Sequence, residues 1–171
     1  MRTSTIRHSV MAAATAAIVL ALGFAGTALG TPGSGVLSGP ILARGDFLDR
    51  VDVKIKAETG NGLVVSNEPG AGEVVVQEIT IAPGGTTGWH SHPGPVVVIV
   101  RSGALTYVTA DDGVCAERRY PAGTSFIDPG HGNVHTAYNR GNENLVLIAT
   151  YFGVPVGGNQ RIDVPVAPAA C

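Results

Sequence analysis

The feature that most constrains the fold is a succession of short apolar runs, rich in β-branched residues and separated by turn residues. Residues 51–57 alternate apolar and charged side chains with a period of two, which is typical of a strand with one face in the core. After residue 30, no segment of helical length shows helical periodicity with caps. The pattern therefore predicts an all-β sandwich or barrel. Strands are expected at 51–57, 73–82, 95–101, 104–109, 114–120, 124–127, 133–139 and 145–152.

The first 30 residues have the composition of an export signal. Arg2 and Arg7 precede an apolar run at 10–25, and Ala28-Leu29-Gly30 places small residues before a cleavage site expected at Thr31. This order is typical of a secretory signal peptide. The alternative is a retained membrane anchor, but a spanning helix needs about 20 apolar residues, and this run is shorter and contains Gly and Thr. We expect a secreted, extracytoplasmic protein without membrane anchoring after cleavage.

The remaining chain has the size of one domain. Residues 31–40 are rich in Gly, Pro and Ser and are expected to form a flexible lead-in. Residues 41–155 hold the strand-like runs of a single barrel, because the histidine-bearing segment is not repeated. Residues 156–171 contain two prolines and are expected to be an extended C-terminal tail on the outside of the barrel.

The charge distribution argues against a nucleic-acid partner. Without Arg2 and Arg7 the 11 Lys and Arg fall to nine, against 13 Asp and Glu, which gives a net charge of −4. Apart from Arg118-Arg119 the positive residues are scattered singly. A nucleic-acid binder needs a concentrated positive field, and the sequence shows none.

The chain has two cysteines, Cys115 and Cys171. Export would place both in an oxidising compartment, where a disulfide would tie the C-terminal tail to the strand that holds Cys115. The alternative is two unrelated thiols.

Four histidines follow the export signal, and all lie between His90 and His135. Histidine is the commonest protein ligand for divalent transition metals, because neutral imidazole offers a lone pair at ordinary pH. His90 and His92 are two residues apart, so on a strand both rings would project from the same face. An isolated pair of this kind would be an ordinary surface feature, and the surrounding residues therefore decide its meaning.

Those residues resemble the first motif of the cupin superfamily, G-x5-H-x-H-x3-4-E-x6-G. The chain matches it with Gly84, His90, His92 and Gly103. The second motif, G-x5-P-x-G-x2-H-x3-N, is matched with one inserted residue, which leaves Gly132 as the shifted glycine. Its matching positions are Gly123, Pro129, His135 and Asn139.

The resemblance implies a small antiparallel barrel of the cupin type, a jelly-roll-like double-stranded β-helix. In that fold facing strands would bring the two motifs together around a central metal ion. His90, His92 and His135 are then the expected metal ligands. Such barrels often dimerise by pairing sheet edges, so a homodimer is an expected assembly.

One position departs from the family pattern. The first-motif glutamate maps to Val96, or to Val97 after a shift of one, so no carboxylate is available. Three neutral imidazoles leave more positive charge on a bound ion and weaken the preference for hard ions such as manganese. We expect iron, zinc, copper or nickel rather than manganese. Some cupin thiol dioxygenases also use three histidines, whereas the manganese-dependent oxalate reactions use the glutamate and are less expected.

Four further residues are candidates for the pocket. Gln77 lies on the strand before the first motif, and His131 lies in the loop before His135. Tyr107 is a candidate for lining the barrel, and Asn139 is expected to order the strand end rather than to bind metal. Ordinary loop and packing roles stay open for each, because strand register is not fixed by sequence.

The sequence leaves three functions open. The first is a binding protein that holds one divalent transition metal on three histidines, with a small-molecule ligand in the barrel. The second is a metal-dependent, dioxygenase-like oxidoreductase that acts on a small organic substrate, for which no proton carrier is identified. The third is a metal-free structural barrel, since fold alone does not settle function.

Overall fold

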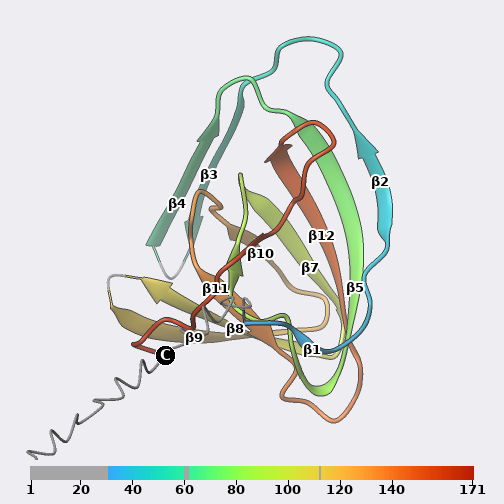
Figure 1. Cartoon of the computed structure of the whole chain (residues 1–171), viewed down its shortest axis with the longest axis vertical. Coiled ribbons are helices and arrows are strands. Elements are labelled where there is room, and N and C mark those ends of the chain that lie inside the picture. The colour runs from blue at the N-terminus through green and yellow to red at the C-terminus, as the bar shows by residue number, and fades with distance from the viewer. Residues whose placement is uncertain (1–30, 60–61, 112) are drawn as a thin grey trace, which may run out of the picture.

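The computed structural model describes residues 31–59, 62–111 and 113–171, and these residues form strands and turns without a helix. They build a nearly closed antiparallel β-barrel (Figure 1), which confirms the predicted all-β class. The strands are β1 (Ser34–Ser38), β2 (Ile41–Gly45), β3 (Val53–Thr59), β4 (Gly62–Glu68), β5 (Glu73–Thr86), β6 (His90–Ser91), β7 (Val96–Ser102), β8 (Ala104–Asp111), β9 (Val114–Pro121), β10 (Ser125–Asp128), β11 (His135–Tyr138), β12 (Leu145–Val154) and β13 (Ile162–Asp163).

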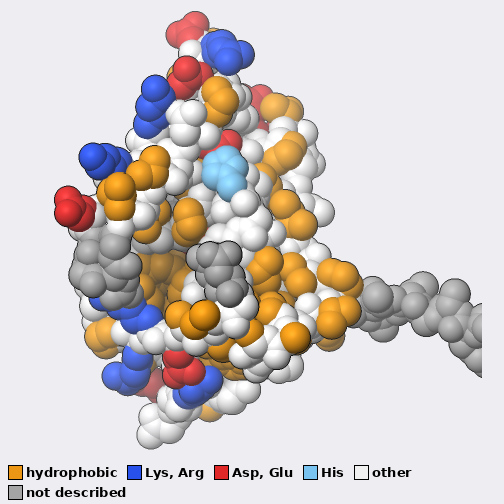
Figure 2. Space-filling model, turned by 90° about the vertical axis from the view of Figure 1, so that its left-hand side faces the viewer, with side chains coloured by type: hydrophobic (Ala, Val, Ile, Leu, Met, Phe, Trp, Pro, Cys, Tyr) orange, Lys and Arg blue, Asp and Glu red, His pale blue; other side chains and the backbone are white. Residues whose placement is uncertain are grey.

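The predicted export signal at residues 1–30 lies outside the described residues. Within the part of the chain that the structure describes, no helix has the length and apolar character to cross a membrane. On the face that Figure 2 shows, Lys and Arg side chains lie interspersed with Asp and Glu side chains.

The long strand β5 joins the two walls of the barrel. Most of β5 pairs with β12, which pairs in turn with β7, and β7 pairs with β10. The end of β5 pairs with β11, which also pairs with β8 and β6. The sheet therefore bends at the end of β5 and brings β6 and β11, which begin with His90 and His135, side by side.

The core lies between these walls and follows the period of two. Along β12, Leu145, Leu147, Ala149 and Tyr151 are buried while the residues between them are partly exposed. Full burial of a valine or leucine side chain stabilises a fold by about 1.5–3 kcal/mol. Packing of this kind holds the walls in place around the histidines. The other buried apolar residues of the cluster are Val75, Ile81, Val96, Val98, Val100, Leu105, Ala137 and Val154.

Strand β5 is longer than predicted. The sequence predicts a strand at 73–82 that stops before Pro83-Gly84-Gly85, but β5 continues to Thr86. The backbone N–H of Gly84 donates to the Asn139 carbonyl at 2.8 Å, and the Asn139 N–H donates to the Gly85 carbonyl at 2.9 Å. The Gly84 φ of 75° is a conformation that glycine adopts readily. The glycines therefore bend the strand without ending its pairing.

The segment expected to be a flexible lead-in contains a paired strand. Strand β1 lies along β5, with Val36 opposite Ile81, and the Thr31 N–H donates to the Val164 carbonyl at 3.1 Å. Backbone pairing therefore orders residues that composition alone predicted to be free. Strands β3 and β4 form a separate two-stranded sheet, and the Ser66 hydroxyl of β4 donates to the Pro129 carbonyl at 3.0 Å.

The C-terminal tail is also built into the structure rather than lying only on the outside. Strand β13 pairs with β6, with Asp163 opposite His90 and Ile162 opposite Ser91. The end of the tail is fixed by a disulfide between Cys115 and Cys171, which confirms the predicted bond. The tail therefore lies against the segment that carries His90 and His92.

Candidate metal centre

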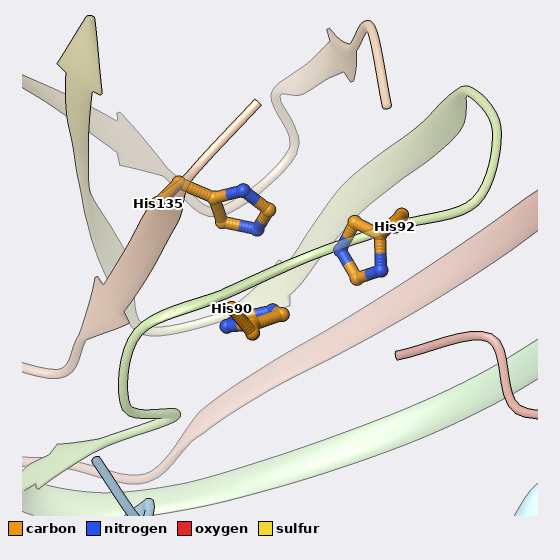
Figure 3. Close-up of side chains that lie close together, drawn as sticks. All are labelled: His90, His92 and His135. Carbon is orange, nitrogen blue, oxygen red and sulfur yellow. The ribbon is translucent and has the colours of Figure 1, made fainter. Parts of the chain in front are cut away.

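The two motifs bring three histidines together inside the barrel. His90 lies in β6, His92 follows that strand, and His135 opens β11 directly opposite His90. Figure 3 shows the three rings pointing toward one another. One ligand atom from each ring lies within 4.8 Å of the others, and all three residues are at most 6% exposed. The structure thus brings together the three predicted metal ligands.

Each ring is held by an oxygen acceptor at its Nδ1 atom. The Nδ1 atoms of His90, His92 and His135 lie 2.7, 2.7 and 3.1 Å from the carbonyl oxygens of Gly88, Gln160 and Asn133, respectively. A carbonyl oxygen only accepts hydrogen bonds, so each Nδ1 must carry the proton. The lone pair then resides on Nε2, which is the arrangement of metal-binding histidines whose other ring nitrogen is fixed by a hydrogen bond.

His135 has a second partner, Asp128 of β10. Its Oδ2 atom lies 3.0 Å from His135 Nδ1, and the side chain is 1% exposed. The same carboxylate accepts hydrogen bonds from the Tyr107 hydroxyl, from the Gly130 N–H at 2.7 Å and from Asn133 Nδ2 at 3.0 Å. A carboxylate behind a metal-binding histidine fixes the ring and raises its basicity. Asp128 is therefore placed to strengthen His135 as a ligand.

Burial sets the protonation states around this centre. Burial, reinforced for His90 and His92 by the neighbouring histidines, lowers the pKa of all three rings, and that of His92 falls from 6.5 to about 4. The rings are therefore neutral at neutral pH, as metal binding requires. Burial, and then the nearby Asp128, raise the pKa of Tyr107 well above 10, so its hydroxyl stays protonated and donates to Asp128.

The donor set suits a divalent transition metal. The three ligand atoms lie within 4.8 Å of one another, so modest side-chain movements would bring all three nitrogens to the length of about 2.0–2.1 Å that zinc–imidazole bonds require. Val96, at the position of the cupin glutamate, is 1% exposed and lines the same space with an apolar side chain. The three histidines thus offer a metal ion three neutral nitrogen ligands.

Two cavities adjoin the histidines. The inner cavity, of about 40 Å³, has apolar walls from β7 and β12. The second, which we call the mouth cavity, has about 440 Å³ and also touches His90 and His92. It gives a small molecule access to these two histidines. Its polar lining includes Gln77, Thr87, Tyr151, Gln160, Arg161 and Asp163.

The structure separates the four additional pocket candidates. Gln77 lines the mouth cavity and Tyr107 lines the inner cavity. His131 lines neither. The His131 backbone has a φ of 51°, and the partly exposed His131 side chain pairs with Glu68 of β4. The turn conformation thus directs it to the β3–β4 hairpin and away from the metal centre.

Asn139 is also not a pocket residue. Its Nδ2 donates to the carbonyls of Ile81 at 2.9 Å and Glu143 at 2.8 Å, and its Oδ1 accepts from the Gly141 N–H at 3.0 Å. These bonds hold the turn after β11 against β5, which is the ordering role expected for it.

The sequence reasoning missed Asp128, Asn133, Gln160 and Arg161. Asp128 stands directly before the motif residue Pro129, so an acid beside the second motif was an available signal. Gln160 and Arg161 carried none, because their contribution depends on the path of the tail.

A family profile described as "Cupin domain" matches residues 77–151. Similar solved structures include an oxalate oxidase in complex with the substrate analogue glycolate, with 26% identity and a TM-score of 0.43 over 47% of this chain and 41% of that chain.

Oxalate decarboxylase from Bacillus subtilis at pH 4.6 is also similar, with 26% identity and a TM-score of 0.42 over 45% of this chain and 20% of that chain. Another structure of that decarboxylase is described by its Mn(II) centres. The aligned part is less than half of each of these chains. No curated protein matches the chain.

Proposed function

We propose that the protein is a secreted cupin that binds one divalent transition-metal ion through His90, His92 and His135, and the match of residues 77–151 to a "Cupin domain" profile supports this. A small-molecule ligand would occupy the mouth cavity. One observation carries the proposal: three buried rings each place a ligand atom within 4.8 Å of the others, while their Nδ1 atoms are fixed by oxygen acceptors. That arrangement is typical of a metal site and unusual for packing histidines.

Two features support the cellular and chemical parts of this proposal. The Cys115–Cys171 disulfide suits an oxidising compartment, as the export signal predicts. The three neutral ligands favour iron, zinc, copper or nickel over manganese, which prefers oxygen ligands. Manganese is nevertheless the ion that metal analysis must specifically exclude, because the Bacillus subtilis decarboxylase carries Mn(II) centres.

Elemental analysis of the purified protein tests the metal site. We expect one transition-metal ion per chain, and its loss in His90→Ala, His92→Ala and His135→Ala variants. His131→Ala is the matched control, because its side chain is partly exposed and pairs with Glu68 instead. Circular dichroism would confirm that each variant retains the strand content. Equal metal content in all four variants, or none in the parent protein, would refute the proposal.

A dioxygenase-like oxidoreductase is the second candidate. The favouring observation is that three protein ligands leave coordination positions open, and that the mouth cavity reaches His90 and His92. Bound ferrous iron would supply oxygen chemistry there. An iron-loaded sample that consumes no oxygen with a panel of thiols, phenols and diketones would exclude catalysis on these substrate classes and favour the binding function.

A further inference from the structure

We infer that the mouth cavity recognises a small organic carboxylate through Arg161 of the C-terminal tail. This inference rests on the proposed metal site, since the ligand would lie beside His90 and His92. It adds the chemical class of the ligand and the residue that selects it.

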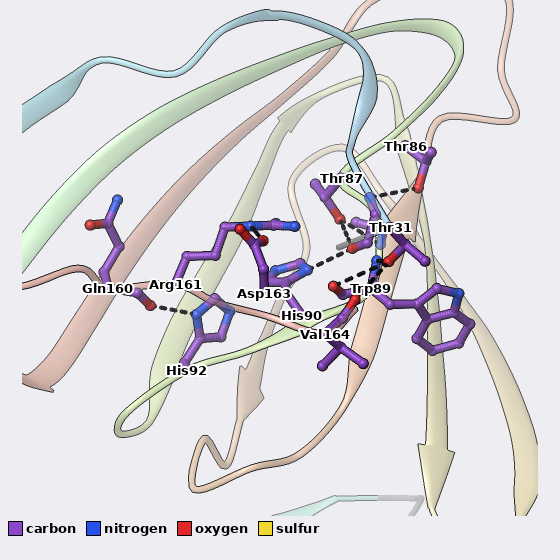
Figure 4. Close-up of polar contacts among 12 residues, drawn as sticks. Thr31, Thr86, Thr87, Trp89, His90, His92, Gln160, Arg161, Asp163 and Val164 are labelled. Carbon is purple, nitrogen blue, oxygen red and sulfur yellow. Dashed lines mark hydrogen bonds and ion pairs between the residues drawn. The ribbon is translucent and has the colours of Figure 1, made fainter. Parts of the chain in front are cut away.

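The tail places Arg161 at the mouth cavity. Its neighbour Gln160 accepts a hydrogen bond from His92 Nδ1, and the next residue begins β13, which pairs with β6. The Arg161 side chain is 31% exposed and lines the cavity together with His90 and His92. Figure 4 shows the side chain beside Asp163 and His90. Backbone contacts on both sides therefore fix the position of the Arg161 main chain, from which the guanidinium extends.

Arg161 retains more donor capacity than the other polar residues of the cavity. Gln77 donates to the Gly39 carbonyl and accepts from both the Tyr151 hydroxyl and Gln160 Nε2 at 3.1 Å. Tyr151 thus uses its only donor, and Gln77 and Gln160 each keep one amide N–H.

In Arg161 only Nε donates a hydrogen bond, to Asp163 Oδ1 at 2.5 Å. Among the described residues, the Arg161 Nη atoms have no hydrogen-bond partner. A guanidinium has five N–H donors in a planar fork that matches a carboxylate. The Nη atoms are thus available to a ligand.

Charge balance points to an anion. The ligand histidines are neutral, so they leave the two positive charges of a divalent ion uncompensated. Asp163 offsets Arg161, but its side chain is 65% exposed and its charge is therefore well screened. An incoming carboxylate would be attracted by both the ion and Arg161. Ile79 and Val36 add apolar surface to the cavity, which suits a short hydrocarbon body on the carboxylate.

The test uses purified zinc-loaded protein and two isosteric probes, butanoate and neutral butanamide, titrated by isothermal calorimetry. We expect butanoate to bind and butanamide to bind at least tenfold more weakly. Arg161→Gln should weaken butanoate binding on the order of 10- to 100-fold, while zinc content stays at one per chain. Asp163→Asn should strengthen it, because the competing carboxylate is removed. Arg101→Gln is the matched control, since Arg101 pairs with Glu78 outside the cavity and should leave binding unchanged.

The outcomes separate this inference from the proposed function. Full zinc content with equal butanoate affinity in the parent and Arg161→Gln proteins would overturn the inference and leave the metal site intact. Equal binding of butanamide would also overturn it. Tight, Arg161-dependent binding of inorganic phosphate in place of butanoate would refute the carboxylate assignment. Absence of zinc from the parent protein would refute the metal site and, with it, the inference.

Discussion

The Asp128 carboxylate lies 3.0 Å from Nδ1 of His135, the ring nitrogen that carries the proton, and leaves Nε2 free to bind a metal. Tyr107 donates to the same carboxylate oxygen. The chain lacks a carboxylate at Val96, where the cupin glutamate would stand, but has a buried carboxylate behind His135, one of the three candidate ligands. Asp128 thus acts on the metal site through the His135 ring.

Replacing Asp128 with asparagine should weaken metal binding. The amide removes the negative charge that supports His135, and loss of such a partner typically lowers metal affinity about 10- to 100-fold. Competition with a chromophoric chelator measures the change. Glu117→Gln is the matched control, because Glu117 forms an exposed ion pair with Arg140. Unchanged affinity in Asp128→Asn would show that Asp128 has only a packing role.

The fold class and the ligand triad could be predicted from the sequence because both depend on local patterns. Alternation with a period of two identifies strands such as 145–152, and the motif spacing selects His90, His92 and His135. Neither prediction required knowledge of which strands pair.

The supporting residues depend on long-range pairing and could not be predicted in the same way. Gln160 lies 68 residues after His92 in the chain and reaches it only because β13 pairs with β6. Strand β1 was not predicted because its glycine and two serines are typical of a flexible segment, and pairing with β5 decides its structure. His131 was a reasonable ligand candidate by proximity in sequence, but its turn directs it to Glu68.

The metal-free protein should lose stability as the pH falls from 6.5 toward 4. The buried histidines resist protonation in the folded state, with a pKa of about 4 for His92 against 6.5 when unfolded. In this window the unfolded chain binds more protons, so acidification favours unfolding. His92 alone should lower the free energy of unfolding by about 2 kcal/mol between pH 7.5 and 5.

Urea unfolding of chelator-treated protein at the two pH values measures this loss. A His92→Gln variant should lose less stability over the same interval. Equal stability of the parent protein at both pH values would contradict the burial argument.

Removing the disulfide should destabilise both the fold and the metal site. The Cys115–Cys171 bond closes a loop with a sequence separation of 56, and bonds of this kind contribute roughly 2–4 kcal/mol. The double Cys115→Ser, Cys171→Ser variant should therefore unfold at lower urea concentration. It should also release zinc faster to a chelator, because the tail supplies the Gln160 carbonyl that holds His92. Unchanged zinc release would show that β13 holds the tail without the disulfide.

Restoring the missing carboxylate should change metal preference. Val96 is buried and lines the inner cavity beside the histidines, so Val96→Glu would place an anionic oxygen among neutral nitrogens. We expect a higher ratio of bound manganese to bound zinc after loading from an equimolar mixture, at the cost of lower stability without metal. Val97→Glu, one residue further on the opposite face of β7, is the matched control. An unchanged ratio would show that residue 96 does not reach the ion.

The most direct test of the metal centre is X-ray absorption at the zinc edge of the zinc-loaded protein. The structure predicts three imidazole nitrogens at about 2.0–2.1 Å, with the outer-shell scattering of the histidine rings, and a reduced imidazole count in His135→Ala. A spectrum without imidazole scattering, or one identical in the parent and His135→Ala proteins, would contradict the assignment of the metal to these three histidines.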